Sequence, residues 1–300
     1  MIGDARLQWT APAVLAYFAA RRSPVPRSSA ASKPKPARTL AQLADRHALY
    51  ERAVQDPEGD VKFFARTYRK IRGHDPISMR EDFCGTAALC CEWARSSPER
   101  TALGVDLSQD TMNWGIEHHL VPAGRDIASR VTLVCDDVRA VKRPKVDLTC
   151  ALNFSYYCFK QRAELLEYFT SVHAGLNRDG VFLLDMLGGT ESILEGNTDN
   201  DHGEFIYRWE QAKFDAFSHD FQCYIHFLFP DGSKIYRAFS YDWRLWMAPE
   251  LRDLLLEAGF SKVHFYWEKT DAKGEGTGVF YEPDYVENQE IWWTYLAAER

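Results

Sequence analysis

Two short segments of the sequence could together hold a nucleoside cofactor. Glu81–Ala88 reads EDFCGTAA, and Leu103–Ser108 reads LGVDLS. The first comes close to a glycine-rich nucleotide loop, in which backbone N–H groups at a helix N-terminus point at an anionic group of the ligand. Asp106, about 20 residues after the loop, lies where a strand should end and where a carboxylate can accept hydrogen bonds from both ribose hydroxyls. The competing interpretation makes Asp106 the N-cap of the helix after Ser108.

The loop departs from the usual glycine pattern. Of the three glycines expected, Gly85 is present, and Phe83 and Ala87 occupy the outer positions. Ala at the third position costs little, because that glycine chiefly permits close packing of helix on strand. Phe83 implies either a locally altered turn or a ring folded over the ligand.

Two later strand ends also carry polar side chains. Asp136 and Asp137 follow the apolar run Val131–Cys135, where a carboxylate could meet an adenine amino group. Asn153 follows the next apolar strand and would face the reactive end of the cofactor. Adjacent aspartates usually form a solvated turn, and Asn at a strand end is more often a turn former than a ligand. These residues therefore indicate a site only together with the two preceding segments.

All four segments fall within a regular alternation of strands and helices. This alternation favours a parallel sheet covered on both faces, with the carboxyl ends of its strands at one edge. The expected strands are 77–83, 101–107, 131–135, 146–153, 181–186, 262–267 and 291–296. The expected helices are 40–71, divided at Asp56-Pro57, then 87–95, 110–119, 162–176 and 248–258, the last ended by Gly259.

A β-rich segment interrupts this alternation after the strand at 181–186. From Glu204 to Trp243 the sequence is dense in aromatic residues, with PDG at 230–232 as a turn, which predicts antiparallel strands. Most of the rings alternate as the core of a sheet would, so we expect packing for most of them and a pocket for a few.

Composition and charge limit the classes of function. The 300 residues are 46% hydrophobic, enough for a large core, and no apolar run approaches a membrane span. Residues 1–40 carry seven basic side chains against one acidic, a net charge of +6, so the remainder carries −13 and disfavours nucleic acid. The seven cysteines lack zinc-site spacing. We expect reduced thiols of an intracellular protein and no metal.

The basic N-terminal segment has a composition of its own. Arg21–Pro36 is rich in Pro, Ser and Ala with few large apolar residues, so residues 1–40 are expected to be disordered. The same basic, acid-poor composition is compatible with an organelle transit peptide. A cytoplasmic protein with a floppy extension and an organelle-targeted protein are both left open.

The order of these features resembles the class I S-adenosylmethionine-dependent methyltransferase family. CGTAAL, LGVDLS, CDDV and RDGVFLLD are similar to successive motifs of that family, in detail over about 75–190 and in outline over 45–300. The resemblance implies a doubly wound, mostly parallel seven-stranded sheet over residues 41–300. It also implies S-adenosylmethionine as the cofactor. Because the β-rich insertion, 190–245, leaves the fifth strand at the edge where the methyl group should emerge, we expect it to form a substrate lid.

The same resemblance implies roles for individual residues. Gly85 and Thr86 would approach the methionine moiety, and Asp106 the ribose. Leu107 and Val138 would cover the adenine faces, Asp136 or Asp137 would meet its amino group, and Glu81 or Asp82 would be the acid of the loop. The predicted cofactor site comprises Glu81, Asp82, Cys84, Gly85, Thr86, Ala87, Asp106, Leu107, Asp136, Asp137, Val138 and Asn153.

Methyl transfer is an in-line displacement that depends on positioning and on exclusion of water, so a general base is optional. The candidates for such a base are Tyr156, Tyr157, Glu210, His226 and Asp242. Asn153–Tyr156, NFSY, is similar to the Asn-Pro-Pro-Tyr signature of amide-nitrogen methyltransferases but lacks both prolines, so that specificity is not carried over.

The expected function is methyl transfer to a small-molecule acceptor. Two alternatives are a catalytically silent cofactor-binding sensor or scaffold and a nicotinamide-dependent oxidoreductase. The altered glycine loop argues against the oxidoreductase. The acceptor and the oligomeric state are left open.

Overall fold

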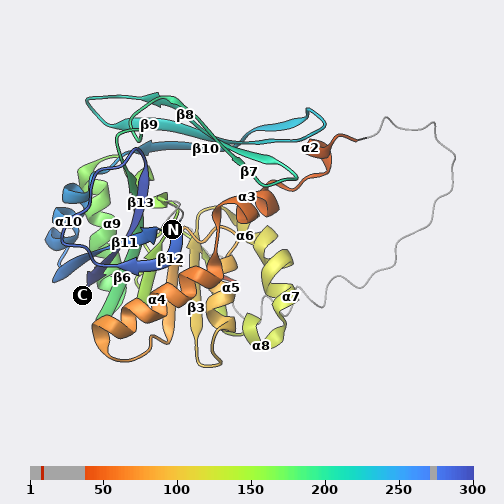
Figure 1. Ribbon diagram of the computed structural model, residues 1–300. Helices are drawn as coiled ribbons and strands as arrows, with labels where there is room; N and C mark the ends of the chain where they lie inside the picture. Colours follow the sequence, from red (N-terminus) through yellow and green to blue (C-terminus); the bar gives the residue numbers. More distant parts are fainter. Residues whose placement is uncertain (1–7, 10–37, 271–275) are drawn as a thin grey trace, which may run out of the picture. The chain divides into compact units, whose positions relative to one another are not determined.

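The computed structural model describes residues 8–9, 38–270 and 276–300 (Figure 1). The predictions for residues 1–40 therefore lie almost wholly outside the described residues. The chain divides into two compact units. Among the described residues, the main unit contains Gln8–Trp9, Asp56–Ile193 and Arg244–Arg300, and the second unit contains residues 38–55 and Leu194–Trp243.

A nine-stranded sheet forms the centre of the main unit among the described residues. Its strands are β1 (Gln8–Trp9), β2 (Ser78–Asp82), β3 (Thr101–Asp106), β4 (Val131–Cys135), β5 (Val146–Ala151), β6 (Leu176–Gly188), β11 (Lys262–Thr270), β12 (Gly276–Tyr281) and β13 (Trp292–Glu299). They are ordered β1-β4-β3-β2-β5-β6-β13-β11-β12. β4, β3, β2, β5 and β6 run parallel, whereas β13 is antiparallel to both β6 and β11. The predicted mostly parallel α/β sheet is confirmed, with β1 and β12 added at its edges as strands that were not predicted.

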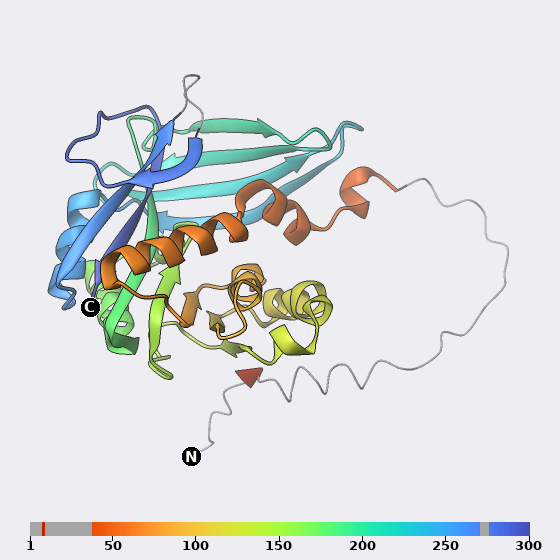
Figure 2. The same cartoon turned by 60° about the horizontal axis from the view of Figure 1, so that its bottom comes forward.

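The helices of the main unit follow the predicted alternation. They are α4 (Pro57–Arg72), α5 (Ala88–Arg95), α6 (Gln109–Gly115), α7 (Val121–Ala123), α8 (Arg125–Ala128), α9 (Arg162–Gly175) and α10 (Ala248–Glu257), with a π-helical turn, η1 (Ile116–Leu120), and a 3-10 turn, η2 (Ser155–Cys158). α4 packs beside α5, and α9 packs beside α10 (Figure 2).

The start of α4 illustrates how the sequence sets a boundary. The Asp56 carboxylate caps the helix by accepting a hydrogen bond from the Gly59 N–H, and Pro57 takes the first helical position, where no N–H is needed. The helix ends at Gly73, whose φ of +81° suits glycine. Its buried face includes Val61, Phe64 and Tyr68, which are spaced three and four residues apart as on one face of a helix.

The second unit is built on a separate antiparallel sheet. Its described strands are β7 (Gly196–Asp201), β8 (Ile206–Phe214), β9 (Asp220–Leu228) and β10 (Lys234–Arg244, whose last residue falls in the main unit), ordered β10-β9-β8-β7. The predicted PDG turn joins β9 to β10, with Gly232 at φ +81°. Two short helices, α2 (Leu40–Leu43) and α3 (Arg46–Val54), belong to this unit.

Leu49 of α3 forms an apolar cluster with Phe205, Ile225, Phe227 and Ala238. The antiparallel character of the insertion is confirmed, whereas its packing partner, α3, was not predicted. No helix in the described parts of the chain is long and apolar enough to cross a membrane.

Candidate cofactor site

The loop between β2 and α5 has a left-handed backbone at each position of the glycine pattern. φ is +59° at Phe83, +51° at Gly85 and +59° at Ala87. For the two residues that carry a Cβ, this conformation costs about 1–2 kcal/mol each. The loop therefore keeps the backbone that glycines would favour, although two of the three glycines are replaced. The expectation that Ala at the third position costs little is wrong, because Ala87 has the same left-handed φ as Phe83.

Packing of the Phe83 ring helps to offset that cost. The ring lies 6.0 Å from the ring of Phe159 and 5.7 Å from the ring of Tyr168, measured between centroids. Tyr168 is completely buried, and its own ring lies 5.1 Å from that of Phe159. An aromatic side chain at this loop position therefore joins the core next to α9.

Asp106 at the end of β3 joins the loop to the strand that follows it. Its Oδ2 accepts a hydrogen bond from the Gly85 N–H at 2.8 Å, and its Oδ1 accepts one from the Ser108 N–H at 2.7 Å. The N-cap of α6 is Ser108, whose Oγ accepts from the Thr111 N–H. The interpretation of Asp106 as the helix cap is therefore wrong. Burial raises the pKa of the Asp106 carboxyl.

Helix α6 approaches the loop so closely that one helical position excludes a side chain. A Cβ at Gly115 would lie 2.0 Å from the carbonyl oxygen of Thr86. Gly104 of β3 is similarly crowded, because a Cβ there would lie 2.8 Å from the Cys84 Sγ. Sequence reasoning did not identify Gly115, although a glycine within the predicted helix 110–119 was a signal that could have pointed to close approach.

A group of carboxyls lies around the loop. Glu81 is 7% exposed, and its Oε2 accepts hydrogen bonds from the Cys90 N–H at 3.2 Å and the Cys90 thiol at 3.0 Å. Burial raises the pKa of Glu81 to about 8, and the like charges of Asp60 and Asp106 add to the effect.

Asp60, on the first turn of α4, accepts a hydrogen bond from the Tyr295 hydroxyl, and burial raises its pKa to about 6. The sequence motifs did not point to Asp60, because it precedes them in the chain. Its contact with Tyr295 of β13 forms only through the tertiary fold.

Asp82 faces a different environment from Glu81, because successive side chains of a strand point to opposite faces. Its Oδ1 accepts a hydrogen bond from the Arg80 Nε at 2.6 Å, and its Oδ2 accepts one from the Tyr168 hydroxyl at 2.9 Å. Asp82 and Arg80 are each 1% exposed. Asp82 is thus part of a buried ion pair, and Glu81 is the better match to the acid of the loop.

The two aspartates after β4 also differ. The Asp137 carboxylate accepts hydrogen bonds from the Arg139 guanidinium, with Nη2 to Oδ2 at 2.7 Å, and this bonding lowers the pKa of Asp137. The Asp136 N–H donates to the carbonyl oxygen of Asp106 at 3.1 Å, which places Asp136 beside the end of β3. Asp136 is therefore the better candidate to read an adenine amino group.

The two apolar residues expected at the adenine faces contrast in exposure. Leu107 is 73% exposed, which is unusual for a leucine directly after a buried strand, and Val138 is 3% exposed. Leu107 offers an open apolar surface to a ligand, whereas the side chain of Val138 is already covered.

The turn at Asn153 is held by a single buried carboxylate. φ is +55° at Asn153 and +57° at Phe154, and their N–H groups donate to the Asp185 Oδ2 and Oδ1 at 2.7 and 2.9 Å. Burial raises the pKa of Asp185 to about 7. Because proline is locked near φ −65°, the position of Phe154 cannot accept proline in this conformation. The backbone at Phe154 therefore gives no support for the amide-nitrogen specificity of the Asn-Pro-Pro-Tyr signature.

The hydroxyls of two candidate bases, Tyr156 and Tyr157, form hydrogen bonds with backbone groups of β6. The Tyr156 hydroxyl donates to the Asp185 carbonyl oxygen at 2.7 Å, and the Tyr157 hydroxyl accepts from the Leu187 N–H at 3.4 Å. Both side chains are completely buried, and burial raises the pKa of each phenol.

The other three candidates belong to the second unit. Glu210 and His226 form a pair on neighbouring strands, with the His226 Nε2 at 2.7 Å from the Glu210 Oε2. The His226 Nδ1 accepts a hydrogen bond from the Arg237 N–H at 3.1 Å, so Nε2 carries the proton and donates to Glu210. Asp242 is exposed on β10. No cluster of three potential metal ligands occurs in the parts of the chain that the structure describes.

Comparisons with known proteins bear on this geometry. No protein-family model matches the sequence, and no curated protein matches it either. Solved structures do match. An S-adenosylmethionine-dependent methyltransferase from Clostridium acetobutylicum has a TM-score of 0.61 at 19% identity, over 84% of this chain and 96% of that chain.

Two further matches come from enzymes that act on sugars. CalS10, an amino pentose methyltransferase from Micromonospora echinaspora solved with S-adenosylmethionine bound, has a TM-score of 0.59 at 15% identity, over 89% of this chain and 100% of that chain. The sugar N-methyltransferase KedS8 from Streptoalloteichus has a TM-score of 0.57 at 16% identity, over 92% of this chain and 99% of that chain. The chain therefore has the fold of class I S-adenosylmethionine-dependent methyltransferases.

Proposed function

We propose that this protein is an S-adenosylmethionine-dependent methyltransferase that acts on a small-molecule acceptor. The observation that carries the proposal is Asp106, a carboxylate at the end of β3 that is hydrogen-bonded to Gly85 of the loop. In this proposal the Asp106 carboxylate accepts the ribose hydroxyls, and it lies beside a loop with left-handed backbone at Phe83, Gly85 and Ala87.

The bonding within the loop argues against a dinucleotide. A pyrophosphate needs N–H groups that point outward, yet the N–H groups of Cys84, Gly85 and Ala87 donate to Val105, Asp106 and Cys84 in turn. In their ionised forms, the neighbouring carboxyls of Asp60 and Glu81 would also repel a pyrophosphate. The same carboxyls suit a ligand with a positive sulfonium and a positive amino group, so the donor and acceptor groups present fit S-adenosylmethionine better than a nicotinamide cofactor.

The roles of the individual residues follow from their positions. We assign the ribose hydroxyls to Asp106, the adenine amino group to Asp136 and one adenine face to Leu107. In their ionised forms, Glu81 and Asp60 supply negative potential near the loop. When bound, the cofactor supplies an electrophilic methyl group on sulfur. The chain orients the reactants and excludes water, and the buried hydroxyls of Tyr156 and Tyr157 take no part in proton transfer.

The acceptor is proposed to be a small amine or hydroxyl compound. CalS10 and KedS8 act on an amino pentose and a sugar nitrogen, so a panel of acceptors should begin with amino sugars. We further propose that residues 190–245 form the substrate lid and determine which acceptor is used, with the aromatic residues of β8 and β10 as its lining. Trp209→Ala or Tyr241→Ala, with the fold shown to be intact by circular dichroism, should then depress methyl transfer far more than cofactor affinity.

Calorimetric titration of the full chain tests the cofactor, and a mass-spectrometric acceptor screen tests the reaction. Binding of S-adenosylmethionine and S-adenosylhomocysteine, with no heat from NAD or flavin, supports the proposal. Preferential binding of a dinucleotide overturns it. Cofactor binding without transfer to any acceptor in a broad screen would favour the sensor or scaffold alternative.

A further inference from the structure

A buried arginine links the strand before the loop to the connection after β4. Arg80 is 1% exposed on β2, and its Nη2 donates to the carbonyl oxygen of Val138 at 2.6 Å. Its Nη1 donates to the carbonyl oxygen of Val141, and its Nε donates to the Asp82 Oδ1 at 2.6 Å. A buried guanidinium is costly unless its donors and its charge are satisfied, and here they are satisfied by the connection itself and by Asp82.

Further contacts hold the same connection. The Ser171 Oγ of α9 donates to the carbonyl oxygen of Arg139 at 2.7 Å, between the two carbonyls that Arg80 binds. Arg139 in turn binds Asp137. The backbone from Val138 to Val141 is therefore fixed at three successive points. Asp136 and Asp137 leave β4 directly before this fixed segment, so their direction is set by it.

We propose that Arg80 is a positioning residue for recognition of the adenine amino group. It touches neither the ligand nor the reacting atoms. By holding the Val138 and Val141 carbonyls, it keeps the carboxylate of Asp136 where the exocyclic amino group of the purine arrives. The inference rests on the proposed function, because it assigns to Arg80 the reading of one group of the cofactor.

The chain offers a matched control in Arg130. Its Nη1 donates to the carbonyl oxygens of Ser97 and Arg100, each at 2.9 Å, and to that of Ala94. Its Nη2 pairs with Asp126 at 2.8 Å. Arg130 thus has the same kind of partners as Arg80, namely carbonyls of a connection and one aspartate, but it holds the turn between α5 and β3.

The test compares the affinities of two ligands in each variant. S-adenosylhomocysteine carries the purine amino group, and S-inosylhomocysteine carries a carbonyl oxygen in its place. Calorimetry on the wild type should show a preference for the first, and Arg80→Lys should reduce that preference by about fivefold or more, the value of about one hydrogen bond. Arg130→Lys should lower the melting temperature while leaving the preference unchanged.

Each outcome decides between positioning and general stability. If Arg80→Lys weakens both ligands equally, or leaves both unchanged, the positioning role is overturned. A wild type that binds both ligands equally overturns it as well. A wild type that binds neither ligand overturns the proposed function instead, so the two failures are distinguishable.

A second variant covers the case in which Arg80→Lys does not fold. Ser171→Ala removes the other anchor of the connection without burying a charge. A reduced preference in Ser171→Ala supports a recognition role for the anchored connection, and an unchanged preference overturns it.

Discussion

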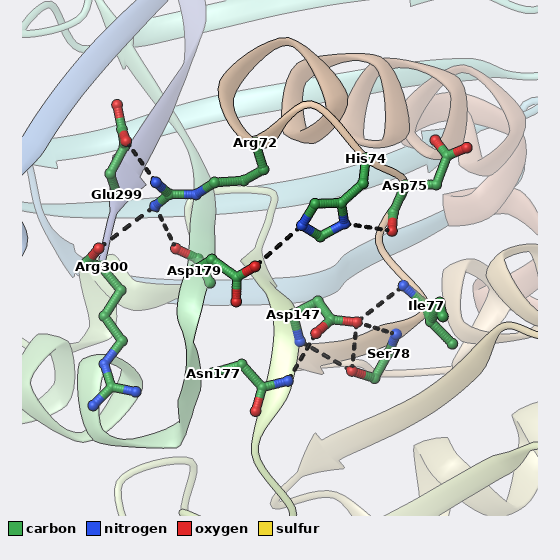
Figure 3. Close-up of polar contacts among 11 residues, drawn as sticks. Arg72, His74, Asp75, Ile77, Ser78, Asp147, Asn177, Asp179, Glu299 and Arg300 are labelled. Atoms are coloured by element: carbon green, nitrogen blue, oxygen red, sulfur yellow. Dashed lines mark hydrogen bonds and ion pairs between the residues drawn. The ribbon is translucent and has the colours of Figure 1, made fainter.

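The two ends of the parallel strands in the main unit both carry an aspartate that accepts backbone N–H groups, with opposite electrostatic results. Asp106 lies at the carboxyl end of β3, and burial raises the pKa of its carboxyl. Asp147 lies at the amino end of β5, where its Oδ2 accepts from the N–H groups of Ile77 and Ser78 and its Oδ1 accepts from Asn177 (Figure 3). These hydrogen bonds outweigh burial and lower the pKa of Asp147.

The surroundings of the two aspartates explain the difference. At the amino end, acids meet bases: Arg72 pairs with Glu299 at 2.9 Å, and His74 with Asp179 at 3.1 Å (Figure 3). At the carboxyl end, Glu81 meets the like charges of Asp60 and Asp106. Negative charge that the protein itself compensates stabilises the fold, whereas concentrated acid around a loop fits a cationic ligand.

The largest expected effect distinguishes Asp106 from Asp147 when each is replaced by alanine. Asp106→Ala removes two hydrogen bonds to ribose hydroxyls, each worth about 1.5 to 3 kcal/mol, so S-adenosylmethionine affinity should fall by roughly a hundredfold or more. Asp147→Ala should lower the melting temperature and leave cofactor affinity unchanged. Calorimetry and thermal unfolding of both variants give the answer. Normal cofactor binding by folded Asp106→Ala would remove the ribose contact from the proposal.

The next effect concerns the close approach of α6 to the loop. In Gly115→Ala the new methyl group meets the Thr86 carbonyl, so the loop or the helix must shift. We expect the affinity for S-adenosylhomocysteine to fall by about tenfold or more. Gly196→Ala is the control, because nothing lies within 4 Å of a Cβ built there. If both alanine variants bind alike, the loop does not depend on this packing.

A third prediction concerns pH and the buried acids of the carboxyl end. The folded pKa values of Asp60, Asp185 and Glu81 are raised to about 6, 7 and 8. In the unfolded chain these carboxyls release their protons near pH 4. Between about pH 4 and about pH 8 the folded state therefore binds more protons, and the free energy of unfolding should fall as pH rises.

Cofactor binding should run in the opposite direction over part of this range. A cationic ligand favours the ionised carboxyls, so affinity should increase several-fold from about pH 6 to about pH 8, with release of protons. Calorimetry in buffers of different ionisation enthalpy measures that release. Affinity that does not change across this range would mean that these carboxyls do not face the bound cation. Asp147, with its lowered pKa, should affect unfolding only on acidification below about pH 4.

Local patterns were sufficient to predict much of the main unit. The apolar run at 131–135 coincides with β4, and the predicted helix 87–95 differs from α5 by one residue. The position of Asp106 at a strand end also followed from spacing alone. In each case the signal is hydrophobic periodicity or a turn within a short window, which is fixed by neighbours along the chain.

Long-range contacts were beyond such patterns. Asp60 contacts Tyr295, and Arg80 contacts Val138 and Val141. These residues are far apart in the sequence, so hydrophobic periodicity within a short window does not predict their contacts. The packing of α3 on the antiparallel sheet was also missed, because a short apolar stripe does not say which sheet it covers. At Phe83 and Ala87 the residue types argue against the left-handed backbone that the fold imposes, so tertiary structure overrides local preference there.

The smallest effect tests whether every polar group at the carboxyl end serves the ligand. Tyr156 lies there, but its hydroxyl is buried and donates to the Asp185 carbonyl oxygen. Tyr156→Phe should therefore cost about 1 kcal/mol of unfolding free energy and leave the rate of methyl transfer within about twofold. Tyr157→Phe should behave in the same way, because the Tyr157 hydroxyl contacts the Leu187 N–H. A large loss of kcat in either variant, at normal cofactor affinity and with the fold intact by circular dichroism, would show a phenol acting as a base. The carboxyl end would then hold a catalytic phenol whose hydrogen bonds in the structure indicate only a role in stability.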